Sequence, residues 1–151
     1  MAICLTEDVG LFKIDREGKL IEIMKFRGDF AQELPTVNHC KISDDNTLFA
    51  TGGDDKIIRI YPLNKEFKKE GDKKVEIDVA TASITGIDIN RDNSLMVASS
   101  KDGFAYMINL STRQVIQKLS FKNQPTARNF MMRACIIRRY DNAIYTLAIQ
   151  A

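Results

Sequence analysis

The sequence contains a segment that repeats itself, and this repeat constrains the fold more than any other feature. Residues 37–63 align with residues 84–110 without a gap, which places Asp45 on Asp92, 47 positions later (92 − 45 = 47). Both copies join three short apolar runs through two polar turns. A unit of this length, built from short strands, is typical of a radial or stacked repeat fold.

Partial copies of the same unit lie on both sides of these two. Asp8 precedes Asp55 by 47 positions (55 − 8 = 47), and Asp141 follows Asp92 by 49 positions (141 − 92 = 49). We therefore expect two complete structural units, with an incomplete one at each end of the chain.

The spacing of apolar and polar residues predicts an all-β protein. The turns between the apolar runs are rich in Asp, Asn and Gly, which bond their own backbone or adopt conformations that other residues avoid. No apolar stripe with helical spacing extends beyond about three turns. Short, numerous strands combined with a repeat favour a β-propeller over a plain sandwich. We expect about thirteen strands in sheets of four.

These units predict a single partial propeller domain over residues 1–151, with about three to four blades. Complete four-stranded blades are expected at residues 37–79 and 84–121, and incomplete blades at residues 1–26 and 132–151. Because closed propellers have about 4–8 blades, we expect the arc either to be part of a longer chain or to form a homo-oligomer, two arcs giving a ring of roughly six blades.

Charge and hydropathy argue against two classes of partner. The net charge is +2, from 22 basic and 20 acidic side chains, which is no basic footprint for nucleic acid. No apolar run approaches the roughly 18 residues that a membrane helix needs. The short apolar start runs into Thr6-Glu7-Asp8 and does not resemble a signal peptide. A cytoplasmic protein without a membrane span is predicted.

The cysteine pattern predicts no disulfide framework and no zinc site. Cys4, Cys40 and Cys135 are odd in number and lack CxxC spacing. We expect reduced thiols inside strands, as in cytosolic proteins. Three scattered cysteines with the single histidine, His39, do not match the spacing of zinc ligands.

No residue pattern predicts catalysis. His39 adjoins Cys40, but neighbours along a strand point to opposite faces, so the pair does not face a common substrate and His39 is expected to be structural or at the surface. Asp8, Asp55 and Asp102 recur in every copy, which indicates turn architecture. The sequence therefore predicts a non-enzymatic chain with no catalytic, cofactor-binding or metal-binding residues.

Two further motifs lack the context that a ligand site needs. Asp44-Asp45 and Asp54-Asp55 are not set in a twelve-residue calcium loop. Gly52-Gly53 is expected to form a turn, and it lacks the Gly-Lys-Ser/Thr sequence and the helix of a phosphate-binding loop.

Candidates for partner contacts are few. Residues 64–73 and 122–129 are predicted to be long loops, and binding residues favour loops on a rigid scaffold. A local basic cluster is interpreted as a solvated strand edge, with a partner surface as the less favoured reading. Its members are Arg133, Arg138 and Arg139.

The repeats resemble those of the WD-repeat family. Each has a strand, an Asp-Asn turn and a second strand; the first copy continues with ATGGDD and a strand ending in IRIY. Tyr61-Pro62 and Ile108-Asn109 stand where the family commonly has a Trp-Asp pair. The resemblance implies a propeller that binds other proteins.

A closer resemblance covers most of the chain. The order of NHCKI at 38–42, LFATGGDD at 48–55, IRIY at 58–61, ITGIDI at 84–89, RAC at 133–135 and IYTL at 144–147 is similar to the middle blades of the prolactin regulatory element binding protein family. That family comprises endoplasmic-reticulum guanine-nucleotide exchange factors for the small GTPase that starts COPII coat assembly. The resemblance implies a small GTPase partner and the cytosolic face of the endoplasmic reticulum.

The same resemblance implies no exchange residue in this chain. The family's exchange loop lies in its N-terminal blade, its membrane anchor is C-terminal, and neither is found in these residues. The resemblance therefore implies the central part of such a protein, or a reduced relative. Two alternatives differ from the GTPase-binding hypothesis: a general WD-repeat adaptor in another complex, and a propeller hydrolase. The hydrolase is disfavoured because no constellation of carboxylates and histidine supports it.

Overall fold

The computed structural model describes residues 2–4, 9–26, 36–64, 74–120, 133–137 and 146–150, and the side-chain surroundings of 12–22, 36–64 and 74–120. Within these ranges all regular structure is β-strand, which confirms the predicted all-β class. The strands are β1 (Ala2–Cys4), β2 (Val9–Ile14), β3 (Leu20–Phe26), β4 (Val37–Ile42), β5 (Leu48–Gly53), β6 (Ile57–Pro62), β7 (Val75–Asp78), β8 (Ile84–Ile89), β9 (Leu95–Ser100), β10 (Phe104–Asn109), β11 (Gln114–Ser120), β12 (Arg133–Ile137) and β13 (Thr146–Gln150).

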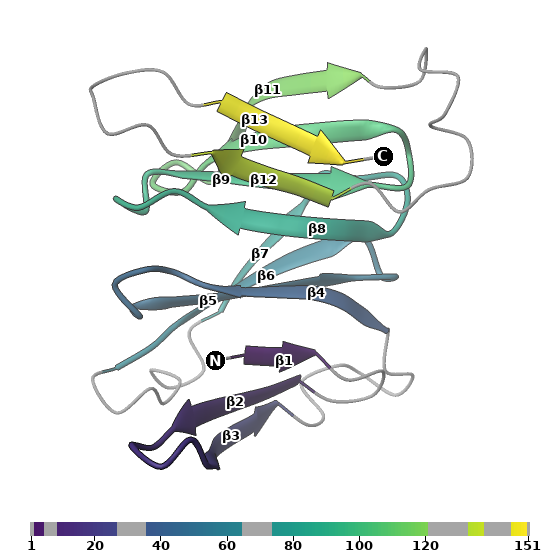
Figure 1. Cartoon of the computed structure of the whole chain (residues 1–151). Helices are drawn as coiled ribbons and strands as arrows, with labels where there is room; N and C mark the ends of the chain where they lie inside the picture. The colour runs from purple at the N-terminus through teal and green to yellow at the C-terminus, as the bar shows by residue number, and fades with distance from the viewer. Residues whose placement is uncertain are drawn as a thin grey trace.

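Each complete repeat forms one antiparallel sheet of four strands. The first runs in the order β4-β5-β6-β7 and the second in the order β8-β9-β10-β11. A three-stranded sheet, β1-β2-β3, precedes them, and a two-stranded sheet, β12-β13, follows. The first three sheets are stacked in chain order from the bottom of the view (Figure 1), and β12 of the last sheet contacts β8 and β9. This arrangement is that of a partial propeller.

The first strand of each complete sheet lies on the inside of the arc. β4 packs against β8, and β8 in turn packs against β12 (Figure 1). In the first complete sheet, the second strand, β5, contacts the first strand of the next sheet, β8. In the same way, β1 contacts β4. The N-terminal sheet therefore corresponds to the second, third and fourth strands of a blade, and the C-terminal sheet to the first two.

The core fills the space between the two complete sheets. Every residue of β8 is buried, because this strand lies between its own sheet and β4. Its three isoleucines join the buried core, while its buried polar residues Thr85 and Asp88 have partners in Ser99 Oγ and Lys41 Nζ. The buried cluster consists of Ala50, Ile58, Ile60, Ile77, Ala80, Ile84, Ile87, Ile89, Met96, Ala98, Tyr106 and Ile108.

The Gly52-Gly53 pair serves close packing. Both residues end strand β5, where a turn was expected. A Cβ atom on Gly52 would lie 2.6 Å from Cγ2 of Ile84, and one on Gly53 would lie 2.0 Å from the carbonyl oxygen of Thr36. Neither position leaves room for a side chain, so the glycines let neighbouring elements approach.

A second sequence-based expectation, that of reduced thiols, is also wrong. Cys40, expected to be a reduced thiol, is disulfide-bonded. It lies on β4, inside the arc, where strands distant in sequence converge. Cysteines scattered along a chain do not reveal by their spacing which of them approach one another in the fold. In the part of the chain that the structure describes, no helix is long and apolar enough to cross a membrane.

Candidate functional site

Turns and connections from the two complete sheets meet at one end of the arc. The turn between β5 and β6 is held by a hydrogen bond from the Asp54 amide to the Thr36 carbonyl, 2.9 Å. The equivalent turn between β9 and β10 is held by a bond from the Lys101 amide to the Ser83 carbonyl, also 2.9 Å. We call residues 36–38, 53–56, 79–83 and 100–103 the loop rim.

Asp102 organises the second half of the loop rim. Its carboxylate accepts hydrogen bonds from the Tyr106 hydroxyl at 2.6 Å, the Thr81 amide at 3.0 Å and the Phe104 amide at 3.1 Å. Burial alone would raise the pKa of the Asp102 carboxyl, but these donors outweigh it and the pKa is lowered. Burial and the adjacent carboxylate raise the pKa of Tyr106.

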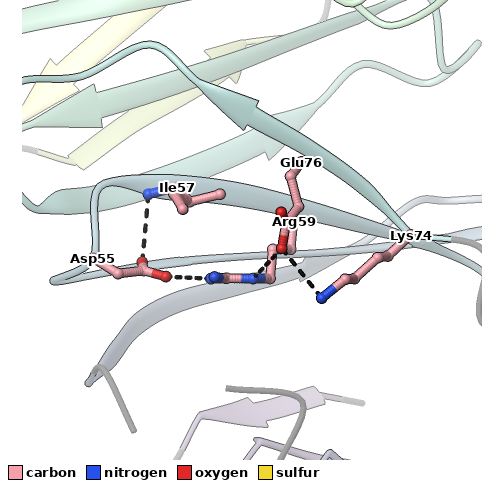
Figure 2. Close-up of polar contacts among 5 residues, drawn as sticks. All are labelled: Asp55, Ile57, Arg59, Lys74 and Glu76. Atoms are coloured by element: carbon pink, nitrogen blue, oxygen red, sulfur yellow. Dashed lines mark hydrogen bonds and ion pairs between the residues drawn. The ribbon is translucent and has the colours of Figure 1, made fainter. Parts of the chain in front are cut away.

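In the first half, Asp55 stands in place of Asp102 and is bonded by Arg59, as Figure 2 shows. Arg59 lies on β6, with its side chain only 10% exposed, and bonds the Asp55 carboxylate through one terminal nitrogen and Glu76 through Nε at 3.1 Å. Burial opposes the charged guanidinium, but Asp55 and Glu76 raise the pKa of Arg59 above its ordinary value. Lys74, 3.2 Å from Glu76, and then Arg59 lower the pKa of Glu76.

Asn38 links the two sheets at the loop rim. The Asn38 side-chain amide donates to Asp54 Oδ1 at 2.9 Å and to the Ile84 carbonyl, in the next sheet, at 3.0 Å. These bonds hold the turn of one blade against the first strand of the next. The Asn38 amide, followed by the Ser83 hydroxyl, lowers the pKa of Asp54.

His39 and Lys41 connect β4 to β8 along the inside of the arc. The Ile87 amide donates to Nδ1 of His39 at 3.2 Å, and Lys41 Nζ lies 2.7 Å from Asp88 Oδ1. His39 thus holds strands together, and its Nδ1 is occupied by a backbone donor. The ion pair was not foreseen, because its partners lie 47 residues apart (88 − 41 = 47), in separate repeats.

The opposite end of the arc carries a second link between the sheets. Asp45 accepts hydrogen bonds from Ser43 Oγ at 2.7 Å, the Thr47 amide at 3.1 Å and Asn93 Nδ2 at 2.8 Å. The Ser43 hydroxyl, followed by Asn93, lowers the pKa of Asp45 well below its usual range. Asn46 and Asn93 occupy equivalent turn positions, with φ of 60° and 58°.

The carboxylates of the loop rim and of these links are therefore used for architecture. Within the described ranges, no group of three or more His, Cys, Asp or Glu residues could hold a metal ion. What the loop rim offers to other molecules is a rigid set of exposed side chains: Asp54, Lys56, Thr81 and Lys101. Arg133 begins β12. Arg138, Arg139, residues 65–73 and residues 122–129 lie outside the described residues.

The sequence matches the family model described as "WD domain, G-beta repeat" over residues 23–61 and 73–109. These two segments cover 76 of the 151 residues, which is half of the chain (39 + 37 = 76). The chain belongs to the WD40 family. WD40 domains mediate protein interactions, and this WD40 chain has the rigid strands and exposed turns that such a role needs.

A solved structure supports the same fold. The chain is similar to the crystal structure of the C-terminal WD40 domain of Sif2, with a TM-score of 0.58 and 20% sequence identity over 78% of this chain. It spans about a third of that structure, 32% of its length. No curated protein matches the WD40 chain closely enough to add a relative.

Proposed function

We propose that this WD40 chain is a non-catalytic protein-interaction segment whose loop rim binds a small GTPase, as part of endoplasmic-reticulum export. The observation that carries the interaction role is the locking of two complete blades through Asn38, His39 and Lys41. A scaffold tied at three points keeps its exposed turns in fixed positions, which reduces the entropy lost when a partner binds.

The choice of a small GTPase rests on the sequence resemblance to the prolactin regulatory element binding protein family. Many of the resembling residues, among them Phe49, Ile58, Tyr61 and Ile87, are at most 1% exposed. They specify the scaffold, whereas partner choice depends on exposed turns, so the resemblance supports the GTPase less directly than it supports the fold. For the same reason a general WD-repeat adaptor in another complex is the competing function.

The proposed context is the cytosolic face of the endoplasmic reticulum, with the COPII GTPase as partner. In this proposal the chain holds the GTPase and contributes no exchange residue. Binding would then be strongest for the nucleotide-free form, which is the form that an exchange factor stabilises.

A binding experiment tests this function. The full chain is immobilised, and the purified COPII small GTPase is applied nucleotide-free, loaded with GDP, or loaded with a non-hydrolysable GTP analogue. We expect capture of the nucleotide-free form, weakened about tenfold by the charge reversals Lys56→Glu and Lys101→Glu. The control, Lys13→Glu on β2, leaves capture unchanged. Failure to capture any form would favour the adaptor.

A further inference from the structure

The outer strand of the second complete blade, β11, is exposed along its length. It ends its sheet in the order β11-β10-β9-β8, and its only strand partner among the described residues is β10 (Figure 1). Six of its seven residues are exposed, and the seventh, Leu119, is intermediate. An edge of this kind presents a row of backbone N–H and C=O groups that can pair with another extended chain.

Two apolar side chains on this edge are exposed to water. Val115 is 39% exposed and Ile116 is 54% exposed. The register with β10 shifts here, because Met107 pairs with Gln117 while Ile108 pairs with Val115, so that Ile116 is the extra residue of a β-bulge. Bulges occur at sheet edges and re-aim side chains, and this one presents two adjacent β-branched groups to solvent.

The charged side chains of β10, β11 and the turn between them have one sign. From Gly103 to Ser120 the sequence contains Arg113 and Lys118 but no Asp or Glu. Lys118 Nζ lies over the Phe104 ring at 3.9 Å and the Tyr106 ring at 5.0 Å, so its charge is held beside the strand. Pairing β11 with a second copy of itself would bring four cations together with no anion in either hairpin.

The outer strand of the first complete blade differs in each respect. β7 has four residues, and its exposed positions are Glu76 and Asp78. Its buried apolar residue, Ile77, is 5% exposed. A short strand with charged side chains is a protected edge. Of the two complete blades, only the second therefore has an outer strand with these properties. The outer strand of the N-terminal sheet, β3, also carries exposed apolar residues, but it has Glu22 among them.

We propose that β11 is a β-addition site for an extended segment of a partner protein in which β-branched residues alternate with acidic ones. Backbone pairing along β11 supplies affinity, contacts with Val115 and Ile116 bury apolar surface, and the acidic side chains meet Arg113 and Lys118. This site is separate from the loop rim and does not depend on the GTPase proposal.

Selection from a library of random decapeptides displayed on phage, against the full chain, tests the proposal. We expect enriched sequences that alternate Val, Ile or Thr with Asp or Glu. Synthetic copies of them should bind about tenfold more weakly to Ile116→Ser and to Lys118→Gln, and more weakly at high salt. The matched control is Ile21→Ser on β3, an outer strand whose Ile21 is 46% exposed; it should bind normally.

Three outcomes overturn the proposal. The first is enrichment of basic or proline-rich peptides, and the second is no enrichment at all. The third is enrichment of acidic peptides that bind Ile116→Ser, Lys118→Gln and the unaltered chain with the same affinity. Sedimentation equilibrium without peptide covers the competing occupant, because a dimer lost in Ile116→Ser would show that a second copy covers β11. Circular dichroism of each variant verifies that the sheets are intact.

Discussion

Arg59 and Tyr106 occupy the same position in successive repeats, 47 residues apart (106 − 59 = 47), and each bonds the aspartate four residues before it. Arg59 lies on β6 and Tyr106 on β10, the third strand of each sheet. The repeat therefore preserves a geometric requirement, a donor that reaches back to the turn carboxylate, while the donor changes from a guanidinium to a phenol. Asp55 and Asp102 are constant because only a short acceptor reaches both the turn amide and this donor.

The phenol of Tyr106 should contribute measurably to stability. Tyr106→Phe removes the 2.6 Å bond to Asp102 and leaves a half-buried acceptor with fewer donors. We expect a loss of about 1–3 kcal/mol in the free energy of unfolding, because hydrogen bonds to charged groups contribute more than neutral ones. Urea denaturation measures it. In a double-mutant cycle with Asp102→Asn the two losses should not add; independent losses would contradict the pairing.

The turn at Lys56 should be improved by glycine. Lys56 has φ of 71°, and the equivalent residue in the next repeat, Gly103, has φ of 84°. A side chain in this region costs roughly 1–2 kcal/mol, partly offset by the greater freedom of glycine in the unfolded chain. We expect Lys56→Gly to raise the free energy of unfolding by about 0.5–1 kcal/mol.

The control for this prediction is Lys56→Ala. Alanine removes the same charge and the same long side chain but keeps the Cβ atom that the positive φ disfavours. Thermal unfolding should show a higher midpoint for Lys56→Gly and none of that gain for Lys56→Ala. Equal midpoints for the two variants would assign the effect to the lysine side chain.

Gly52 should not tolerate even a methyl group. Gly52→Ala places a Cβ atom 2.6 Å from Cγ2 of Ile84 and 2.9 Å from Cδ1 of Ile87, so the two sheets must separate slightly. We expect a loss of about 1–3 kcal/mol from overpacking. The loss should shrink when Ile84→Ala removes the atom that clashes, although that variant alone is destabilised by a cavity. Urea denaturation of the unaltered chain, the two single variants and the double variant measures these losses. If Gly52→Ala costs the same free energy of unfolding with and without Ile84→Ala, the strain does not come from the contact with Ile84.

The sequence alone predicted the turns and strands, because these depend on residues close together in the chain. The recurrence of Asp55 and Asp102 located the turns, and the apolar runs between turns located the strands, because turn chemistry and period-two patterning act over a few residues. Contacts between blades were not predictable in this way. His39 meets the Ile87 amide, 48 residues later (87 − 39 = 48), and the bond to Cys40 likewise depends on which strands converge inside the arc.

The bulge on β11 shows the same limit on a smaller scale. The second complete blade was expected to end at residue 121, and its outer strand β11 extends from Gln114 to Ser120. The shift that makes Ile116 the extra residue comes from its pairing with β10, which the sequence of one strand does not reveal. Exposure of Val115 and Ile116 follows from the sheet's edge position and from this shift, so the candidate β-addition site could be found only in the fold.

Acid should loosen the link between the two turns opposite the loop rim. The Ser43 hydroxyl and Asn93 hold the pKa of Asp45 below its ordinary value, so the folded chain releases this proton more readily than the unfolded chain. Its stabilising contribution is complete above the unfolded pKa, about 3.9, and is lost as pH falls through the lowered folded value. We expect the free energy of unfolding to decrease from about pH 5 downward.

The variant that isolates this effect is Asn93→Ala, which removes the 2.8 Å hydrogen bond to Asp45 from the neighbouring blade. The pKa of Asp45, followed by carboxyl carbon chemical shifts, should then move up toward its ordinary value, and the stability curve should be flatter in acid. Lys41→Met serves as the control, because it breaks the ion pair with Asp88 on the inside of the arc and should leave the titration of Asp45 unchanged. An Asp45 that titrates identically in Asn93→Ala would mean that Ser43 and Thr47, within its own turn, account for the whole shift, and that the two blades are not coupled through this carboxylate.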